Sequence, residues 1–144
     1  MKQWIFRALG LEFSVEKADV SGFRRREKLS PEEAARKVRY AFLEKTATLQ
    51  GAKAVALGHT GDDQAETVLD RLVRGSGARG LAAMGYRRGP FIRPLLDVRR
   101  RELEAYARER GLQVVHDPSN ALGTRGALRH RVLPELEVIR TGAV

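Results

Sequence analysis

The sequence alternates short apolar runs with longer stretches whose apolar residues recur at helical spacing. The clearest example begins with Ala54 to Gly58, an apolar run closed by glycine, which is typical of a buried strand in a parallel sheet. Residues 59–61 then predict a tight turn, and residues 62–73 predict a helix. Because open α/β sheets bind ligands where a strand leads into a helix, we predict an α/β fold with its site at this turn. The predicted apolar face of the helix comprises Ala65, Val68, Leu69, Leu72 and Val73.

The segment before residue 30 predicts less regular structure. Residues 4–9 resemble the end of a helix that Gly10 stops, and the period-two alternation over residues 11–17 predicts a strand. Residues 21–28 predict a polar connector with three consecutive arginines, Arg24 to Arg26. This run has two interpretations, a solvated loop and a contact to the phosphates of a nucleic acid.

Residues 30–49 carry a strong helix signal. Ser30 is placed as the N-cap, Pro31 occupies the first helical position, and Glu33 is spaced to complete a capping box. Arg36 and Arg39 lie three residues apart, so the helix brings them onto one face. That face is either an exposed basic stripe or a binding surface.

The later elements are shorter. Residues 91–96 predict a strand that Pro94 ends, and Asp97 is predicted to cap a helix over residues 98–110. A basic helix is predicted over residues 124–136. The chain shows no internal repeat, and we predict one partial catalytic domain over residues 1–140 with a tail at 141–144.

Composition narrows the class of protein. The 144 residues are 42% hydrophobic, which is enough for a packed core, and the net charge of +9 points to a polyanionic partner, nucleic acid ahead of membrane. The chain has no cysteine, which excludes disulfides, thiolate metal sites and cysteine nucleophiles and fits a cytoplasmic protein. No apolar run approaches the ~20 residues of a membrane span, so we expect no membrane association.

The glycine-rich stretch from Arg74 to Gly80 contains the spacing GxGxxG. Because it follows a helix and not a strand, we reject a dinucleotide site. Its backbone N–H groups and its flanking arginines, Arg74 and Arg79, could still contact phosphate or RNA. The alternative is a flexible linker.

The predicted turn after the central strand concentrates acidic residues. Asp62, Asp63 and Glu66 lie in the first two turns of the helix, and His59 precedes them. Carboxylates at a helix N-terminus stabilise it by about 0.3–1 kcal/mol each, which explains one or two of them. Three carboxylates beside a histidine in a basic protein instead indicate a site that holds Mg²⁺ through oxygen ligands or grips an ammonium group.

Taken together, these motifs resemble the tRNA(Ile)-lysidine synthetase family, within the N-type ATP pyrophosphatase (PP-loop, adenine nucleotide hydrolase-like) fold. The resemblance rests on GHTGDDQAETVL, RLVRGSGARGLAAM, EEAARKVRYAFLE, IRPLLDVRRRELEAYARERGL and DPSN, and it covers roughly residues 8–136. It implies a two-step reaction in which ATP adenylates O2 of the wobble cytidine in the CAU anticodon of an isoleucine tRNA. The ε-amino group of free lysine then attacks C2 and releases AMP.

The resemblance also implies roles for particular residues. His59, Asp62, Asp63 and Glu66 would be catalytic, and Asp62 and Asp63 would also hold Mg²⁺. Two further groups of residues follow. ATP or substrate would contact Arg36, Arg39, Tyr40, Arg74, Gly75, Ser76 and Gly77, and contacts to tRNA or structural roles would fall to Arg93, Asp117, Ser119, Asn120 and Arg129.

Two departures from the family shape our expectations. Nothing in residues 1–30 resembles the family's Ser-Gly-Gly-x-Asp-Ser phosphate loop, and the segment after Asn120 is about two residues short, with Gly126 and Ala127 where the family tends to carry Asn and Arg. We therefore expect an N-terminally truncated fold that is inactive alone. We also expect its open strand edges to be covered by rearrangement, self-association or a partner.

Two alternatives stay open. The first is a tRNA-thiolation relative of the same fold, against which the absence of cysteine counts. The second is a non-catalytic basic remnant that binds tRNA, for which steeply salt-dependent RNA binding without ATP binding would argue.

Overall fold

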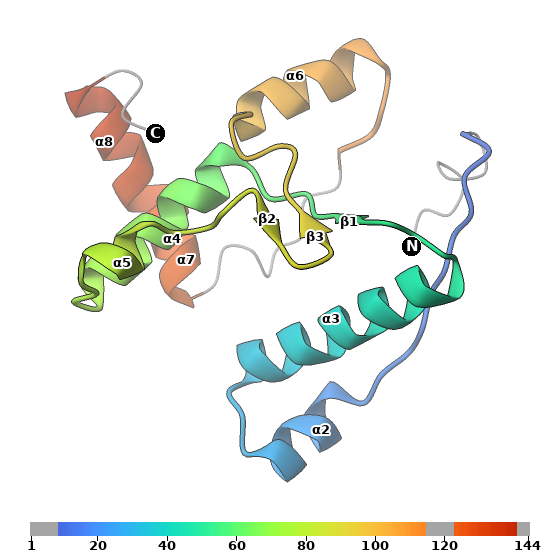
Figure 1. The fold of residues 1–144 in the computed structure, drawn as a ribbon. Coiled ribbons are helices and arrows are strands. Elements are labelled where there is room, and N and C mark those ends of the chain that lie inside the picture. Colours follow the sequence, from blue (N-terminus) through green and yellow to red (C-terminus); the bar gives the residue numbers. More distant parts are fainter. Residues whose placement is uncertain (1–8, 115–122, 141–144) are drawn as a thin grey trace. The chain divides into compact units, whose positions relative to one another are not determined.

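The computed structural model describes residues 9–114 and 123–140 of the chain. Within this range the chain forms two compact units, one ending at Val55 and the other beginning at Ala56. Figure 1 shows both units, and we describe each by itself. The predicted helix end at 4–9 lies almost wholly outside the described residues, and the tail at 141–144 lies fully outside them.

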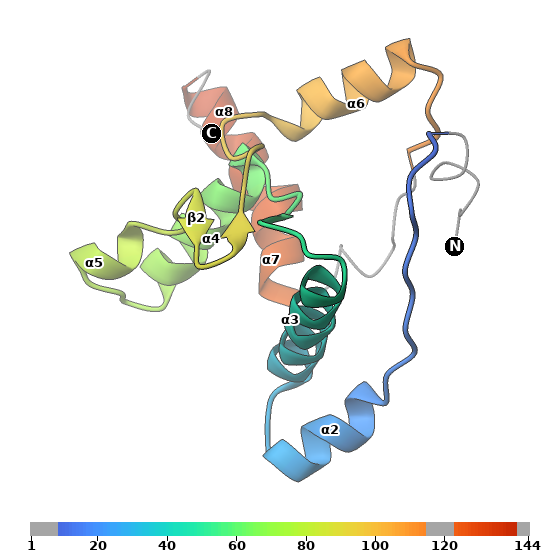
Figure 2. The same ribbon diagram turned by 45° about the vertical axis from the view of Figure 1, so that its right-hand side comes forward.

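The described residues of the first unit form two helices, α2 (Val20–Glu27) and α3 (Pro31–Leu49). Both views show α2 lying against α3 (Figures 1 and 2). Helix α3 confirms the predicted capping box, because Ser30 Oγ accepts from Glu33 N and Glu33 Oε2 accepts from Ser30 N at 3.1 Å. These bonds from Ser30 lower the pKa of Glu33, since they stabilise the carboxylate form.

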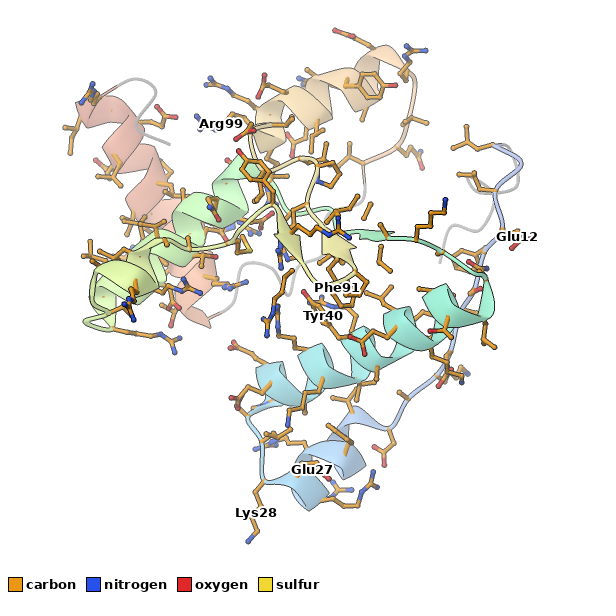
Figure 3. The ribbon with its side chains drawn as sticks, viewed as in Figure 1. Glu12, Glu27, Lys28, Tyr40, Phe91 and Arg99 are labelled. Atoms are coloured by element: carbon orange, nitrogen blue, oxygen red, sulfur yellow. The ribbon has the colours of Figure 1, made fainter. Side chains whose placement is uncertain are left out.

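Two predictions for the first unit are wrong. Residues 21–28 form most of helix α2 and not a connector, because the Asp19 carboxylate accepts from Gly22 N at 2.8 Å and caps the helix. Lys28 ends it in the left-handed conformation, and its side chain extends away from both helices (Figure 3). Residues 11–17 form no strand, because a strand needs a hydrogen-bonded neighbour and the described part of this unit offers none.

The second unit is built on the predicted strand, turn and helix. Strand β1 (Val55–Ala56) leads into α4 (Gly61–Val73), which confirms the predicted order of strand, turn and helix. The predicted burial of the strand is wrong, because Val55 is only half-buried and Ala56 is exposed. The four-residue helix α5 (Ala78–Leu81) follows. Strands β2 (Arg87–Arg88) and β3 (Phe91–Ile92) then form an antiparallel hairpin, and the sheet has the order β1-β3-β2. Helix α6 (Arg100–Glu109) comes next. A last helical stretch comprises α7 (Gly123–Ala127), the π-helical turn η2 (Leu128–Val132) and α8 (Leu133–Ile139).

The buried apolar residues of the second unit come from the hairpin, the segment after it and the last helical stretch. Phe91, Leu96, Leu128 and Leu133 are buried, and each such side chain contributes about 1.5–3 kcal/mol by leaving water. Helix α4 departs from its predicted apolar face. Its buried residues are Glu66 and Thr67, whereas Leu72 and Val73 near its C-terminus are exposed.

The hairpin and the start of α6 are tied together by a tyrosine. Tyr86 donates its hydroxyl proton to the Asp97 carboxylate, whose two oxygens lie at 2.6 and 2.8 Å, and this hydrogen bond raises the pKa of Tyr86. The predicted cap at Asp97 is therefore wrong. Arg99 is the N-cap residue of α6, and Glu102 Oε2 accepts from its backbone N–H at 2.7 Å.

Candidate functional site

The turn between β1 and α4 is shaped by a reciprocal cap. Asp63 Oδ2 accepts from the backbone N–H of Thr60 at 2.8 Å and from its hydroxyl at 2.9 Å, and Thr60 Oγ1 accepts from Asp63 N. Thr60 is 5% exposed. Asp63 therefore serves first as part of the helix start, because its carboxylate satisfies donors that the first turn leaves unpaired.

Gly61 lets this helix start approach the chain ahead of α6. Its N–H donates to Val98 O at 3.0 Å, and a Cβ atom at this position would meet Leu96 O at 3.2 Å. The same approach brings Asp62 to α6, where its Oδ2 accepts from Arg100 N at 2.6 Å. A glycine and an aspartate in sequence thus join the two helix starts.

Glu66 and Arg129 form the most buried ion pair of the described residues. Arg129 Nε donates to Glu66 Oε1 at 2.6 Å and Arg129 Nη2 donates to Oε2 at 2.9 Å, which is the bidentate geometry that favours Arg over Lys. The Glu66 side chain is 1% exposed. Hydrogen bonding to Glu66 raises the pKa of Arg129 against the opposing effect of burial.

Further arginines surround the acidic residues. Asp63 Oδ1 lies 3.3 Å from Arg100 Nη2 and 3.6 Å from Arg129 Nη2. Arg99, labelled at the start of α6 in Figure 3, lies 2.7 Å from Glu137 on α8 and 3.8 Å from Asp62. We call this set the acid–arginine cluster. Its seven members are Asp62, Asp63, Glu66, Arg99, Arg100, Arg129 and Glu137.

The cluster brings together residues that the sequence analysis treated separately. It unites Asp62, Asp63 and Glu66 with Arg129, which had been given only a tRNA or structural role. His59 lies immediately before the cap, half-buried, with its Nδ1 atom buried. Four carboxylates face three guanidinium groups, so the cluster retains one net negative charge within a basic chain.

The Arg129 side chain that contacts Glu66 comes from a backbone in π-helical conformation. It lies in the π-helical turn η2, where the wider spacing changes the direction of a side chain relative to an α-helix. π-Turns inside helices are often found at functional sites. The turn falls in the segment that departs from the family pattern in length and at Gly126 and Ala127.

The Mg²⁺ site predicted at Asp62 and Asp63 stays a prediction. Within residues 9–114 and 123–140, no group of three or more His, Cys, Asp or Glu side chains could hold a metal ion. Both oxygens of Asp63 already face donors. We therefore assign no chemical step to Mg²⁺ here.

The glycine-rich loop is organised differently from its predicted role. The N–H groups of Gly75 and Ser76 donate to Leu72 O and Arg71 O and so cap the end of α4. Arg71 Nη1 donates to the carbonyls of Gly80 and Ala83, which holds the loop in place.

The remaining residues of the loop make fewer contacts within it. Gly77 is the N-cap residue of α5 and, as a glycine, has no side chain to cap that helix. Arg74 is largely exposed and pairs with Asp70 one turn earlier at 3.1 Å. Arg79 is exposed as well, so the side chains of both flanking arginines are accessible for phosphate contact.

The predicted residues of the first unit form a cluster of their own. Arg36 Nη2 donates to the Tyr40 hydroxyl at 3.0 Å, and its guanidinium lies 4.5 Å from the ring centroid. Arg39 lies 5.8 Å from the same ring. These residues occupy one side of α3, as the spacing predicted, and cation–π contact orders their side chains.

Other predicted residues have different outcomes. Asp117, Ser119 and Asn120 lie outside the described residues. Arg93 is 4% exposed, and its Nη1 donates to Gly85 O at 2.7 Å, so it supports the hairpin from inside.

Four residues that organise the site were not predicted from the sequence: Gln64, Arg71, Arg99 and Arg100. The Gln64 side chain exchanges two hydrogen bonds of 3.0 Å with the backbone of Met84, which fixes the segment after α5. The consecutive arginines 99 and 100 at a helix start were a usable signal, because cations are unfavourable there unless carboxylates compensate them.

Comparison with known proteins gives consistent results. The family model of the PP-loop domain matches residues 3–136. A tRNA(Ile)-lysidine synthase of Thermobifida fusca is 57% identical over 109 residues, covering 74% of this chain and 34% of the relative. A tRNA(Ile)-lysidine synthase of Geobacter sulfurreducens is 47% identical over 121 residues, covering 81% and 26%. The chain thus spans between a quarter and about a third of the length of these relatives.

A solved structure shares the fold. The U34-tRNA thiolase NcsA from Methanococcus maripaludis, solved with its [4Fe-4S] cluster, superimposes with a TM-score of 0.74 at 20% identity, over 97% of this chain and 50% of the thiolase. In the described residues, no helix is both long enough and apolar enough to cross a membrane.

Proposed function

The chain belongs to the PP-loop domain family and, within it, to the tRNA(Ile)-lysidine synthetases, an enzyme family of α/β nucleotide-binding fold, and from this membership we propose that it serves ATP-dependent ligation of lysine to C2 of the wobble cytidine of isoleucine tRNA. The observation that carries the proposal is the acid–arginine cluster at the exit of β1 into α4. It concentrates carboxylates where α/β folds bind their ligands.

Within the cluster, Asp62 is the carboxylate best suited to receive the lysine amine. Both oxygens of Glu66 are taken by Arg129 in a buried pair, and both oxygens of Asp63 face Thr60 or arginine donors. Asp62 Oδ2 holds Arg100 N, while no hydrogen bond to its Oδ1 occurs in the described part of the chain. Its side chain is 20% exposed.

The other members then have supporting roles. Glu66 holds Arg129, and Asp63 holds the helix start, so that the position of Asp62 is fixed relative to α6. His59, next to the cap, completes the proposed catalytic group with Asp62, Asp63 and Glu66. A carboxylate held in this way orients an ammonium group without the cost of reorganising at the moment of reaction.

ATP use follows from the PP-loop family. When bound, ATP supplies the adenylate that activates the cytidine for attack by the amine. The exposed Arg74 side chain fits a phosphate contact, and Arg36 and Arg39, with the ring of Tyr40, fit a nucleotide contact in the first unit.

A graft tests the proposal without depending on how much of the enzyme this chain represents. The aligned stretch of the Thermobifida fusca lysidine synthase is replaced by the corresponding residues of this chain, and the graft is given ATP, lysine and the isoleucine tRNA. We expect the digested tRNA to contain a cytidine that has gained a lysine, as measured by mass spectrometry.

The same measurement separates the alternatives. A nucleoside in which sulfur replaces oxygen would favour thiolation. This chain has no cysteine, however, and so no thiolate to ligate a cluster like that of the thiolase. A folded graft that leaves cytidine unchanged, beside an active parent enzyme, would contradict the proposal and favour a non-catalytic RNA-binding role.

A further inference from the structure

The β2–β3 hairpin presents an exposed aromatic ring between cations. Tyr86 is 58% exposed, and Arg87 and Arg88, which follow it, are also exposed. Asp97 is the only acidic residue between positions 85 and 97, and it is engaged by the Tyr86 hydroxyl. The outer surface of the hairpin therefore combines a π-face with positive charge.

The hairpin backbone is held rigidly around this ring. Arg93 donates from Nη1 to Gly85 O at 2.7 Å and from its backbone N–H to Tyr86 O at 2.8 Å, so one residue fixes both carbonyls. Phe91, labelled in Figure 3, is 5% exposed and anchors β3 in the core. The ring itself is restrained by the two short contacts to Asp97. A ring that is already ordered loses little conformational entropy when it binds.

Buried charge strengthens the positive character of this surface. The Arg93 side chain is almost fully buried, its Nε atom has no hydrogen-bond partner, and no ion pair to Arg93 occurs among the described residues. An uncompensated guanidinium in a low-dielectric setting acts over a longer range than a solvated one. It contacts the backbone carbonyl of Gly85, the residue before Tyr86.

From these observations we propose that the hairpin is an RNA-contact surface on which Tyr86 stacks with an unpaired base while Arg87 and Arg88 meet the adjacent phosphates. Single-stranded RNA loops are recognised in this way, by aromatic stacking beside cations. Duplex RNA offers phosphates but no free base face. The inference rests on the proposed tRNA substrate and adds the surface that meets its loop.

Binding of two RNA probes to the whole chain tests the proposal. The first is a hairpin RNA with a CAU-containing loop, and the second is a fully paired duplex of similar length. Fluorescence anisotropy gives both affinities at several salt concentrations. We expect Tyr86→Ala to weaken hairpin binding about 5- to 100-fold and to leave duplex binding unchanged, since stacking contributes on this scale per base. Tyr86→Phe keeps the ring but loses the contacts to Asp97, so it should weaken hairpin binding much less than Tyr86→Ala does.

Matched controls come from α6. Tyr106 is 53% exposed and lies 5.3 Å from the Arg110 guanidinium, so Tyr106→Ala removes a comparable ring elsewhere and should leave hairpin binding unchanged. Arg87→Ala and Arg88→Ala should weaken binding of both probes and each lower the salt slope by about 1. Arg101→Ala on α6 is the control for charge alone.

The outcomes distinguish this inference from the proposed function. If the chain binds the hairpin RNA and a folded Tyr86→Ala binds it equally well, the hairpin surface is refuted while the tRNA substrate stands. If the unmodified chain binds neither probe at low salt, the tRNA substrate fails and the inference fails with it. Equal losses from Tyr86→Ala and Tyr106→Ala would also overturn the inference.

Discussion

Replacing Arg129 with methionine should destabilise the second unit by about 3–5 kcal/mol, because it leaves the carboxylate of Glu66 buried without a partner. Glu66 is 1% exposed and both of its oxygens depend on this one guanidinium. The free energy of unfolding, obtained from urea titration followed by circular dichroism, measures the loss. Since a single domain is stabilised by only about 5–15 kcal/mol, the variant should be close to unfolding.

Two further variants isolate the cause. The double variant Glu66→Met, Arg129→Met removes both charges and should be more stable than Arg129→Met alone, because no buried charge remains. Arg74→Met breaks the ion pair to Asp70 near the end of α4. It should lower the free energy of unfolding by less than about 1 kcal/mol, because the Arg74 side chain is largely exposed. If Arg74→Met and Arg129→Met lowered the free energy of unfolding by similar amounts, burial of the ion pair would not explain the loss in Arg129→Met.

Asp62→Asn in the graft should lower lysidine formation by about 100-fold or more, while the graft keeps its fold. Asparagine can still accept from Arg100 N through its carbonyl oxygen, so the link between α4 and α6 survives. It can neither pair with the lysine ammonium nor accept the proton that this group must lose before its amine attacks C2, and positioned acid–base groups typically contribute 10²–10⁴-fold. Because lysine attacks only after adenylation, release of pyrophosphate from ATP should continue.

Asp70→Asn is the matched control. Asp70 lies on the same helix and pairs with Arg74 near the surface, away from the cluster. Its side chain is 16% exposed, comparable to the 20% of Asp62, so the two substitutions remove a carboxylate of similar burial. Loss of the Asp70 carboxylate should leave lysidine formation within about twofold of the unmodified graft, because among the described residues this carboxylate pairs with Arg74 and with no member of the cluster. If Asp62→Asn retained full activity, or if it abolished pyrophosphate release as well, the role given to Asp62 would be wrong.

Local signals in the sequence predicted the elements whose causes are local. The capping box at Ser30 and the apolar run before Gly58 depend on neighbouring residues alone, and both α3 and the β1–α4 unit lie close to their predicted bounds. The prediction over residues 124–136 was nearly complete, although the helical stretch extends to Ile139. Helix α6 begins two residues later than predicted.

Features that depend on distant partners were missed. Glu66 is buried because Arg129, 63 residues later, neutralises it, and no pattern within α4 contains that information. Asp97 faces Tyr86 and not its own helix because the hairpin brings the tyrosine to it. The alternation of residues 11–17 has the pattern of a strand, but a strand forms only with a neighbour to pair with.

The position of the candidate site was predicted from the sequence, but the different partner of each of its carboxylates was not. The three carboxylates at the start of α4 do lie together, and the structure separates them by their partners: a cap for Asp63, a buried guanidinium for Glu66 and the start of α6 for Asp62. The arginines that make this separation come from α6 and η2. The Mg²⁺ site and the self-association expected from the sequence stay predictions.

The most direct measurement is a nuclear magnetic resonance titration of the isotope-labelled chain with free lysine, compared with norleucine, which has the same carbon chain without the ε-amine. The account predicts lysine-specific shifts in the backbone amides of Asp62 and Asp63 and at Arg100, with norleucine giving none. Equal responses to the two amino acids, or lysine-specific shifts confined to residues outside the acid–arginine cluster, would contradict it.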